Sequence, residues 1–468
     1  MEGECSYEFI KEGFAKIYIN NEANTFYNPI QEFNRDLTVL LLKTYSKIRE
    51  EQKIEQMEID KPSNKIKLQI KQNLEGIRIL DALSASGLRA IRFALEVPNI
   101  ELIIANDFSE QAVKTIKRNL ELNGLNELKI KPNYSDAIDL MVEHRKFDKR
   151  FHAIDLDPYG ILMVTSTDTA VLCGNSPESC FNKYGSIPIR HKSCHEIALR
   201  IILRSIDSHA NRYGRYIVPL LSISIDFYVR CFVRIESGAA IAKDSVTKLA
   251  NIFSCSNCQC WSLQPLIRKT VNGSNIPIHF GGPIYIAPIH DQVFVQKMLN
   301  SLKEENNLNQ FGTIKRLIGV LTLVLEELND QPLFYEFEQL MRVIKCASTP
   351  KNILVRSALL NAGFRCSGSH CSPQALKTDA PAEFLWDICR EWDRKSNSNG
   401  MRKLNSAGLR IINTKSTRSV DFTLHKEAIP QSKIGNILRF QDNKGKNWGP
   451  KSKAKGSISS HKAGFVNS

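Results

Sequence analysis

Residues 76–123 alternate between short apolar runs and helical segments, and this alternation constrains the fold more than any other feature of the chain. The run at 77–80 ends in Asp81, and a second run at 102–105 is followed closely by Asp107. A turn of small residues and a helical segment lie between the two runs. Strand, turn, helix and strand in this order predict an α/β fold with a parallel sheet.

Two more apolar runs continue the pattern and also end close to acids. Residues 128–131 precede Asp136, and residues 151–156 lead into Asp157. Because the carboxyl ends of parallel strands share one edge of a sheet, we expect four acids to converge on one crevice: Asp81, Asp107, Asp136 and Asp157. Each acid on its own is equally typical of a surface carboxylate that caps a helix.

The turn after the first strand indicates what this crevice binds. It is rich in small residues, so that backbone can approach a ligand, but it lacks the glycine spacing of a dinucleotide site. An acid at the end of the second strand accepts hydrogen bonds from a ribose diol. A nucleoside without a pyrophosphate fits best, and we predict S-adenosylmethionine, with Asp136 near its adenine amine.

Residues 153–160 combine an acid, a proline, an aromatic ring and a glycine. The exocyclic amine of a nucleobase is a poor nucleophile, so an acceptor must take its proton while a flat ring holds its plane. Asp157 and Tyr159 have these two properties. The same four residue types also occur in ordinary turns.

The charge of the chain points to a polyanionic partner. The formal net charge is +14, and Lys and Arg near phosphates release counterions on binding. No apolar run approaches the roughly 18 residues of a membrane span, and the acidic N-terminus is unlike a secretory or transit signal. We expect an intracellular monomer with no membrane partner. Its basic tail at 451–468 is predicted to be disordered and suits the nucleus, with the mitochondrion as the alternative.

Several further segments allow two interpretations each. Arg35 either pairs with Asp36 at a helix start or clamps a cofactor carboxylate. Residues 50–75 are predicted to form an insertion or a mobile loop, and residues 167–185 a long polar loop. His370 and Lys377 either contact phosphates or lie in a solvated loop.

The cysteines divide into one cluster and a scattered set. Cys255 and Cys258 have the spacing of two zinc ligands, and Cys260, His279 or His290 are the available partners. A relic without metal is the alternative. The scattered cysteines, Cys173 among them, are typical of buried thiols in an intracellular protein.

Segments over nearly the whole chain resemble the tRNA (guanine-26-N2)-dimethyltransferase family: 26–36, 81–92, 106–124, 155–160, 167–185, 281–291, 367–381 and 447–450. The resemblance implies a Rossmann-like S-adenosylmethionine-dependent methyltransferase domain at 1–238 and an α+β domain that binds tRNA at 239–450. It implies that Arg35, Arg89, Asp107, Asp136 and Ala137 line the cofactor site. It further implies that Asp157 acts on a guanine amine to give N2,N2-dimethylguanosine.

The chain departs from this family after Gly160. Members usually have a helix there, whereas here Gly160 runs directly into the apolar residues 161–165. A crossover between parallel neighbours needs about a dozen residues, and the resemblance implies that a segment of about twenty is missing. We therefore expect that 161–165 leaves the fifth position of the sheet or that the sheet is rearranged. A non-catalytic RNA-binding relative is the alternative function.

Overall fold

The structure is a computed structural model of the chain. It describes residues 9–18, 27–60, 76–144, 146, 150–155, 160–255, 258, 260–266, 278–304, 310–396, 406–435 and 437–440. None of the described helices combines the length and the hydropathy that a membrane crossing needs.

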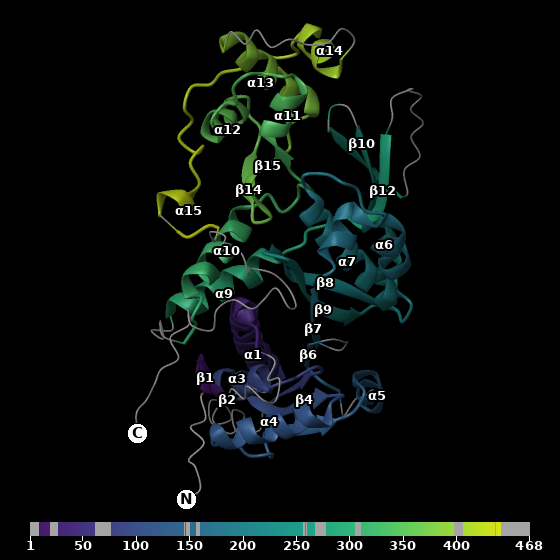
Figure 1. Ribbon diagram of the computed structural model, residues 1–468, viewed down its shortest axis with the longest axis vertical. Coiled ribbons are helices and arrows are strands. Elements are labelled where there is room, and N and C mark those ends of the chain that lie inside the picture. Colours follow the sequence, from purple (N-terminus) through teal and green to yellow (C-terminus); the bar gives the residue numbers. More distant parts are fainter. Residues whose placement is uncertain are drawn as a thin grey trace, which may run out of the picture.

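A mixed sheet of seven strands organises the first half of the molecule (Figure 1). Its order is β5-β4-β3-β6-β7-β9-β8, the first five strands are parallel, and β9 runs antiparallel to both neighbours. The predicted parallel α/β fold is thus confirmed. The strands are β3 (Ile77–Asp81), β4 (Ile100–Asp107), β5 (Ile130–Tyr134), β6 (Ala153–Asp155), β7 (Gly160–Ser166), β8 (Arg215–Ile225) and β9 (Tyr228–Ser237).

The strand after Gly160 corrects one expectation. β7 pairs in parallel with β6, with Ala153 opposite Ile161 and Ile154 opposite Leu162, so it does occupy the position beside β6. The expectation that it would leave this position, or that the sheet would be rearranged, was wrong. The physical reason is the short β6: a three-residue strand rises only about 10 Å, a distance that a few extended residues can retrace. The connecting residues 156–159 lie outside the described part of the chain.

Strand residues alternate between two hydrophobic cores on opposite faces of the sheet. Ile79, Ile103 and Met163 pack with the helices of one face, whereas Leu80 and Leu162 belong to the other. The first face carries α1 (Glu32–Asp60), α3 (Leu88–Glu96), α4 (Glu110–Leu122), α9 (Gln292–Glu304) and α10 (Ile314–Glu326). The second carries α5 (Ala137–Glu143) and α7 (Cys194–Asn211).

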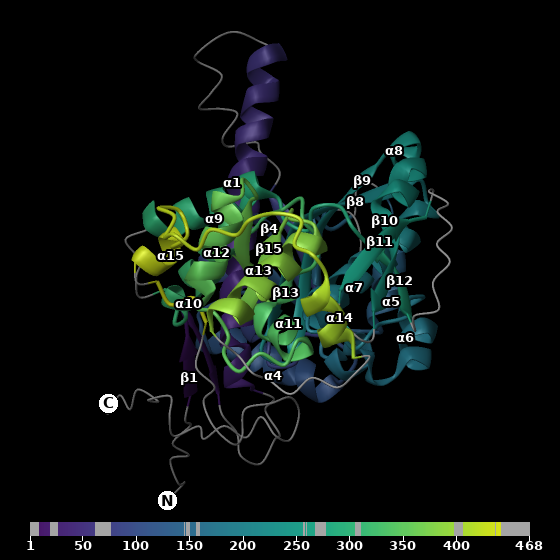
Figure 2. The ribbon, with the colours of Figure 1, turned by 90° about the horizontal axis from the view of Figure 1, so that it is seen from above.

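Two segments expected to be loops contain helices. α1 continues to Asp60, so the predicted insertion at 50–75 is helical over 50–60, and Figure 2 shows this end projecting beyond its neighbours. Residues 61–75 lie outside the described part. Residues 167–185 form the helical turn η3 (Val171–Asn175) and α6 (Pro177–Tyr184). α6 starts with a proline in its first turn and ends at Gly185 with φ 66°, which are ordinary helix boundaries.

The second half contains two small sheets and a separate helical core. One sheet has the order β11-β10-β12 and the other β13-β15-β14. Their strands are β10 (Leu249–Cys255), β11 (Trp261–Pro265), β12 (Ile278–Tyr285), β13 (Tyr335–Glu336), β14 (Cys366–Ser369) and β15 (Ser372–Thr378). The second sheet packs with α11 (Phe337–Val343), α12 (Asn352–Asn361) and α13 (Ala382–Lys395) around a core of their own, here called the C-terminal module.

Smaller elements complete the described chain: the hairpin β1 (Phe9–Glu12) and β2 (Ala15–Tyr18), η1 (Pro29–Gln31), α8 (Ala239–Lys243), η4 (Asp244–Lys248), α14 (Ala407–Asn413) and α15 (Gln431–Ile434).

Hydrophobic cores continue across residue 238, because α9 and α10 share a core with α1 and the first strands. The boundary expected at this residue stays a prediction.

Candidate active site

Acids gather along the carboxyl ends of the parallel strands, and we call Asp81, Asp107, Asp136 and Asp155 the acid rim. Asp81 ends β3 directly opposite Asp155, which ends β6. Asp107 ends β4 opposite Tyr134, and Asp136 follows two residues after Tyr134. Three of the four predicted acids therefore lie along one edge of the sheet, and their convergence on a ligand crevice stays a prediction. The predicted catalytic residues Asp157 and Tyr159 lie outside the described part of the chain.

Asp81 is buried at the base of the small-residue turn. Its carboxylate accepts a hydrogen bond of 2.7 Å from the Ser84 hydroxyl. Burial raises the pKa of Asp81, while the nearby Arg89 guanidinium opposes this effect. Asp81 therefore holds the turn in place and is screened from solvent.

Asp107 is held by backbone donors on both sides. Its two carboxylate oxygens accept hydrogen bonds of 2.9 Å from the N–H groups of Ala85 and Ser109. Ala85 has φ 49° and Gly87 has φ 78°, so the turn adopts left-handed backbone that only small residues tolerate at low cost. Each carboxylate oxygen can accept more than one hydrogen bond, which leaves capacity for a diol.

Asn106 was not singled out from the sequence, yet it ties three strand ends together. Its side-chain amide donates to the carbonyls of Ala82 and Ser135 at 3.0 and 3.1 Å. Its oxygen accepts from the Asn133 side chain at 2.7 Å. The sequence offered one signal for Asn106, which is its position directly before Asp107. Successive strand residues point to opposite faces of the sheet, so a polar residue beside Asp107 faces a different set of neighbours.

Asp136 lies at the start of α5, where its side chain caps the helix. It accepts a 2.7 Å hydrogen bond from the N–H of Ile138 and is exposed, while Ala137 is half-buried. Four apolar side chains beside the acid rim are also exposed, between 55% and 71% of their surface: Leu83, Phe108, Tyr134 and Ile138. Sequence reasoning missed them, although each lies within two residues of a rim acid. Their exposure provides apolar faces for a flat ring.

Asp155 is a further functional candidate that the sequence interpretation passed over in favour of Asp157. It forms ion pairs with Arg89 and, at 3.6 Å, with Arg230. Burial lowers the pKa of both arginines to about 10. Arg230 also donates a 2.8 Å hydrogen bond to Thr38 in α1. The Asp155 charge is therefore fixed between the buried Arg230 and the partly exposed Arg89.

Arg35 pairs with Glu12 and not with Asp36, whereas its expected contact with a cofactor carboxylate stays a prediction. Its guanidinium forms a two-pronged ion pair with Glu12, at 2.7 and 2.6 Å, and lies 5.2 Å from the centre of the Tyr27 ring. The expected pair with Asp36 was wrong, because Asp36 binds Arg92 at 2.7 Å instead. β1, which carries Glu12, was not foreseen from the sequence, and this tertiary contact decided the pairing.

Lys377 and His370 also correct the sequence interpretation, which offered phosphate contact or a solvated loop. Both are buried. Lys377 lies 3.1 Å from Glu196 and 3.4 Å from Glu327, and His370 lies 2.6 Å from Glu327. Glu196 also pairs with Arg200 at 2.8 Å in α7. We call these five residues the buried ion network, which joins α7 to the C-terminal module.

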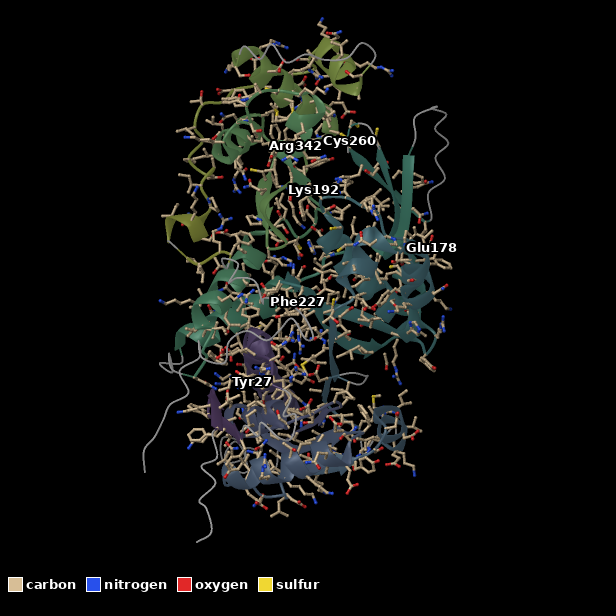
Figure 3. The ribbon with its side chains drawn as sticks, viewed as in Figure 1. Tyr27, Glu178, Lys192, Phe227, Cys260 and Arg342 are labelled. Atoms are coloured by element: carbon tan, nitrogen blue, oxygen red, sulfur yellow. The ribbon has the colours of Figure 1, made fainter. Side chains whose placement is uncertain are left out.

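The predicted zinc ligands lie at the tip of the β10 hairpin. Cys255 ends β10, and the backbone N–H of Cys255 donates to the carbonyl of Cys260 at 2.8 Å. Cys260, which is labelled in Figure 3, accepts a 3.2 Å hydrogen bond from the Trp386 ring. Its thiol lowers the pKa of Cys258 to about 6. His290 lies elsewhere, beside Glu327, and the side chain of His279 is outside the described part. Zinc at Cys255 and Cys258 stays a prediction.

The acid rim as a whole suits S-adenosylmethionine. It includes an acid fixed by backbone amides, a left-handed turn of small residues, and exposed apolar side chains nearby. These match the needs of a ribose, of a close backbone contact and of an adenine ring, respectively.

Comparison with known proteins gives the same assignment. Residues 6–390 match the family described as N2,N2-dimethylguanosine tRNA methyltransferase. The tRNA (guanine(26)-N(2))-dimethyltransferase of Caenorhabditis elegans is 49% identical over 97% of this chain and 94% of its own length. The human enzyme of the same name is 39% identical over 95% of this chain and 77% of its own.

A solved structure agrees with these relatives. Trm1 from Pyrococcus horikoshii, in complex with S-adenosyl-L-methionine, is 32% identical, with a TM-score of 0.66 over 81% of this chain and 98% of that protein. The match to the Caenorhabditis elegans protein spans 504 positions, more than the 468 residues of this chain, so that relative has segments without a counterpart here. This chain belongs to the N2,N2-dimethylguanosine tRNA methyltransferase family.

Proposed function

We propose that the acid rim is the cofactor site of a tRNA (guanine26-N2)-dimethyltransferase, and that this chain transfers two methyl groups to N2 of guanine 26. The observation that carries the proposal is Asp107, which lies at the end of the second parallel strand with both oxygens held by the turn and the next helix. This is the position from which an acid binds a nucleoside ribose.

The residues of the acid rim have distinct roles in cofactor binding. Asp107 accepts hydrogen bonds from the ribose hydroxyls. Asp136 and the backbone of Ala137 bind the adenine amine, and the ring packs against Phe108, which is 71% exposed. Asp81 and Arg89 hold the turn that approaches the sulfonium end, consistent with the Ser84 contact of Asp81.

Arg35 binds the carboxylate of the cofactor only in a conformation that releases Glu12, because Glu12 occupies its Nε and Nη2 groups here. A carboxylate of the cofactor and that of Glu12 have the same charge and shape, so one can replace the other on the guanidinium fork.

S-adenosylmethionine supplies an electrophilic methyl group when bound. Asp157 accepts the proton that the guanine amine loses, and Tyr159 stacks on the base and holds its plane. The guanine leaves its helical stack to reach these residues, because both faces of a stacked base are covered and Tyr159 stacks on one of them.

The second half of the chain, residues 239–450, binds the tRNA. The support is the net charge of +14 and the Lys- and Arg-rich sequence from residue 394 onward. The protein acts as a monomer in the nucleus, with the mitochondrion as the alternative, because a relative from Saccharomyces cerevisiae is named mitochondrial. A fluorescent fusion in cells distinguishes the two locations.

A methyl-transfer assay tests the proposal. Purified protein, labelled S-adenosylmethionine and unmodified tRNA with guanine or adenine at position 26 are combined, with Asp157→Ala as the control. We expect label in N2,N2-dimethylguanosine only with the guanine substrate and the unchanged protein. Transfer that survives Asp157→Ala would exclude Asp157 as the base.

One observation favours a second candidate function, an RNA-binding protein without turnover. Only residues 156–159 separate β6 from β7, although the two strands are parallel neighbours. If these four residues cannot place Asp157 at the acid rim, tRNA and the cofactor bind but no methyl group is transferred. Filter binding of tRNA, measured beside the transfer assay, separates the two functions.

A further inference from the structure

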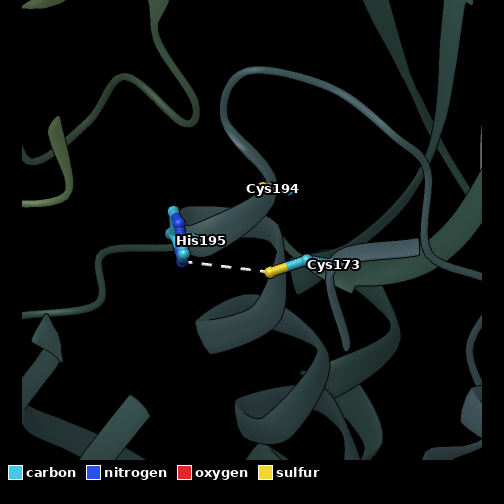
Figure 4. Close-up of side chains that lie close together, drawn as sticks. All are labelled: Cys173, Cys194 and His195. Atoms are coloured by element: carbon cyan, nitrogen blue, oxygen red, sulfur yellow. Dashed lines mark hydrogen bonds between the residues drawn. The ribbon is translucent and has the colours of Figure 1, made fainter. Parts of the chain in front are cut away.

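Three metal-ligating side chains lie together outside the acid rim. Cys173 comes from η3, and Cys194 and His195 are the first two residues of α7. The Sγ of Cys173 lies 3.9 Å from Nδ1 of His195, and Figure 4 marks this contact with a dashed line. One ligand atom from each of the three residues lies within 4.8 Å of the others, and all three side chains are half-buried. An ion can therefore reach them from solvent.

This spacing is close to that of an occupied tetrahedral site. Zinc binds cysteine sulfur at roughly 2.3 Å and histidine nitrogen at roughly 2.0–2.1 Å, which places neighbouring ligand atoms roughly 3.5–3.8 Å apart. The observed separation of 3.9 Å between sulfur and nitrogen is slightly longer than this range, and a small rotation of either side chain removes the difference. Two thiolates and an imidazole also form a soft ligand set, which selects zinc over magnesium or calcium.

The start of α7 favours the thiolate form that a metal requires. Cys194 and His195 lie in the first turn of an 18-residue helix, after Ser193 at the N-cap. The partial positive charge of a helix N-terminus lowers the cost of a thiolate there. The Cys194 backbone N–H already bonds the His191 carbonyl at 3.0 Å, which fixes the position of its side chain.

A second group of potential ligands, His290, Glu327 and His370, serves as a contrast. It is fully buried, and Lys377 lies 3.4 Å from Glu327, so the carboxylate already has cationic partners. A divalent ion there would add charge next to a buried lysine. Within the described part of the chain, no lysine or arginine pairs with Cys173, Cys194 or His195.

We propose that Cys173, Cys194 and His195 bind one zinc ion. The fourth ligand is Cys371 of the C-terminal module or a water molecule, since Cys371 packs in the same hydrophobic core as Cys173. β7 ends at the same edge of the sheet as the acid rim, and η3 begins five residues later. The ion therefore fixes the segment that follows the fifth parallel strand to α7, and its role is structural.

Metal analysis of the full chain tests the proposal. The second thiol cluster is first removed by Cys255→Ser, Cys258→Ser and Cys260→Ser, so that any remaining zinc reports on the proposed site. We expect one equivalent of zinc in this background and a loss of that equivalent when Cys173→Ser and Cys194→Ser are added. Cys346→Ser, a half-buried cysteine of the C-terminal module, is the matched control and retains the metal.

Cobalt exchange keeps the test decisive if the double variant folds poorly. In the background variant, cobalt is expected to give a thiolate-to-metal charge-transfer band that zinc displaces. Absence of zinc and of this band overturns the proposal, and so does a full equivalent of zinc that persists after Cys173→Ser and Cys194→Ser. Free thiols are also counted with and without reductant. A count that is two lower without reductant overturns the proposal, because it indicates a disulfide between Cys173 and Cys194.

Discussion

Two carboxylates of the acid rim, Asp107 and Asp136, and the carboxylates of the buried ion network lie under opposite conditions. In the buried ion network every carboxylate lies between cations, as Glu327 does between His370 and Lys377. In the acid rim, Asp107 takes its hydrogen bonds from backbone amides, and Asp136 is exposed. A carboxylate satisfied by cations joins parts of the protein, whereas one held by amides keeps capacity for a ligand.

The pKa values follow the same division. Burial alone would raise the pKa of Glu327, but His370 and Lys377 lower it below its usual value. Asp81 at the acid rim is equally buried and has a raised pKa, because the opposing effect of Arg89 is smaller than that of burial. Burial by itself therefore does not distinguish a structural acid from a functional one. The charged partners of the acid make this distinction.

Glu327→Gln is expected to have the largest effect among the changes that test this comparison. It leaves Lys377 and His370 buried with a weaker partner, which typically costs about 3–5 kcal/mol of unfolding free energy. Guanidinium unfolding followed by tryptophan fluorescence measures the loss. A change below about 1 kcal/mol would show that the buried ion network does not join α7 to the C-terminal module.

The pH dependence of stability tests whether Arg35 belongs to a structural network. Arg35 and Arg92 lower the pKa of Glu12 from 4.5 to about 2, against the effect of burial. The lowered value means that Glu12 stabilises the fold fully above pH 4.5 and loses this contribution as the pH falls toward 2, by about 3 kcal/mol. The difference in unfolding free energy between the unchanged protein and Glu12→Gln should shrink over this range. A constant difference would contradict the assignment.

Asp107→Asn tests the acid rim. The change removes the charge and one acceptor but keeps the shape, so the affinity for S-adenosylmethionine should fall about 10- to 100-fold, a loss of about 1.4–2.7 kcal/mol. Isothermal calorimetry measures it. Asp139→Asn in the first turn of α5 is the matched control and should bind normally. Equal binding by both variants would remove Asp107 from the site.

Asp330→Asn should have the smallest effect. Asp330 pairs with Arg365 at 2.6 Å, but both side chains are about half exposed, at 54% and 52%. Solvent screens such pairs, so the expected loss of unfolding free energy is about 0.5 kcal/mol. The unfolding experiment used for Glu327→Gln also measures this loss, and Asp330 lies only three residues after Glu327 in the sequence. A loss as large as that of Glu327→Gln would mean that burial does not set the strength of these pairs.

Much of the acid rim could be predicted because it depends on local order along the chain. Asp81 and Asp107 end apolar runs, and a parallel sheet brings such ends to one edge whatever the rest of the protein does. Asp155 was missed because the same apolar run leads into Asp157. The sequence of one run does not show where the strand ends or which of the two acids lies opposite Asp81. Arg230 was missed because it lies in β9, and the order β6-β7-β9 that brings it near Asp155 cannot be read from the sequence.

The partners of charged side chains were the part that sequence reasoning could not supply. Arg35 was expected to pair with Asp36 or to clamp a cofactor carboxylate, and His370 and Lys377 to contact phosphate or solvent. The cofactor contact of Arg35 stays a prediction, but the ion pairs that form are with acids distant in the sequence: Glu12 for Arg35, and Glu196 or Glu327 for Lys377. A charge attracts any opposite charge, so the pattern of charges along a chain does not specify which pair forms.

The amino-acid sequence alone determined the alternation of strands and helices, the edge where the acids gather and the family resemblance. These depend on residue order, since apolar periodicity sets each element and parallel strands align their ends. Tertiary structure alone decided that β7 lies beside β6, that α7 is tied to the C-terminal module by buried charges, and that Cys173 meets Cys194 and His195. These contacts join residues far apart in the chain, and their geometry exists only once the layers have packed.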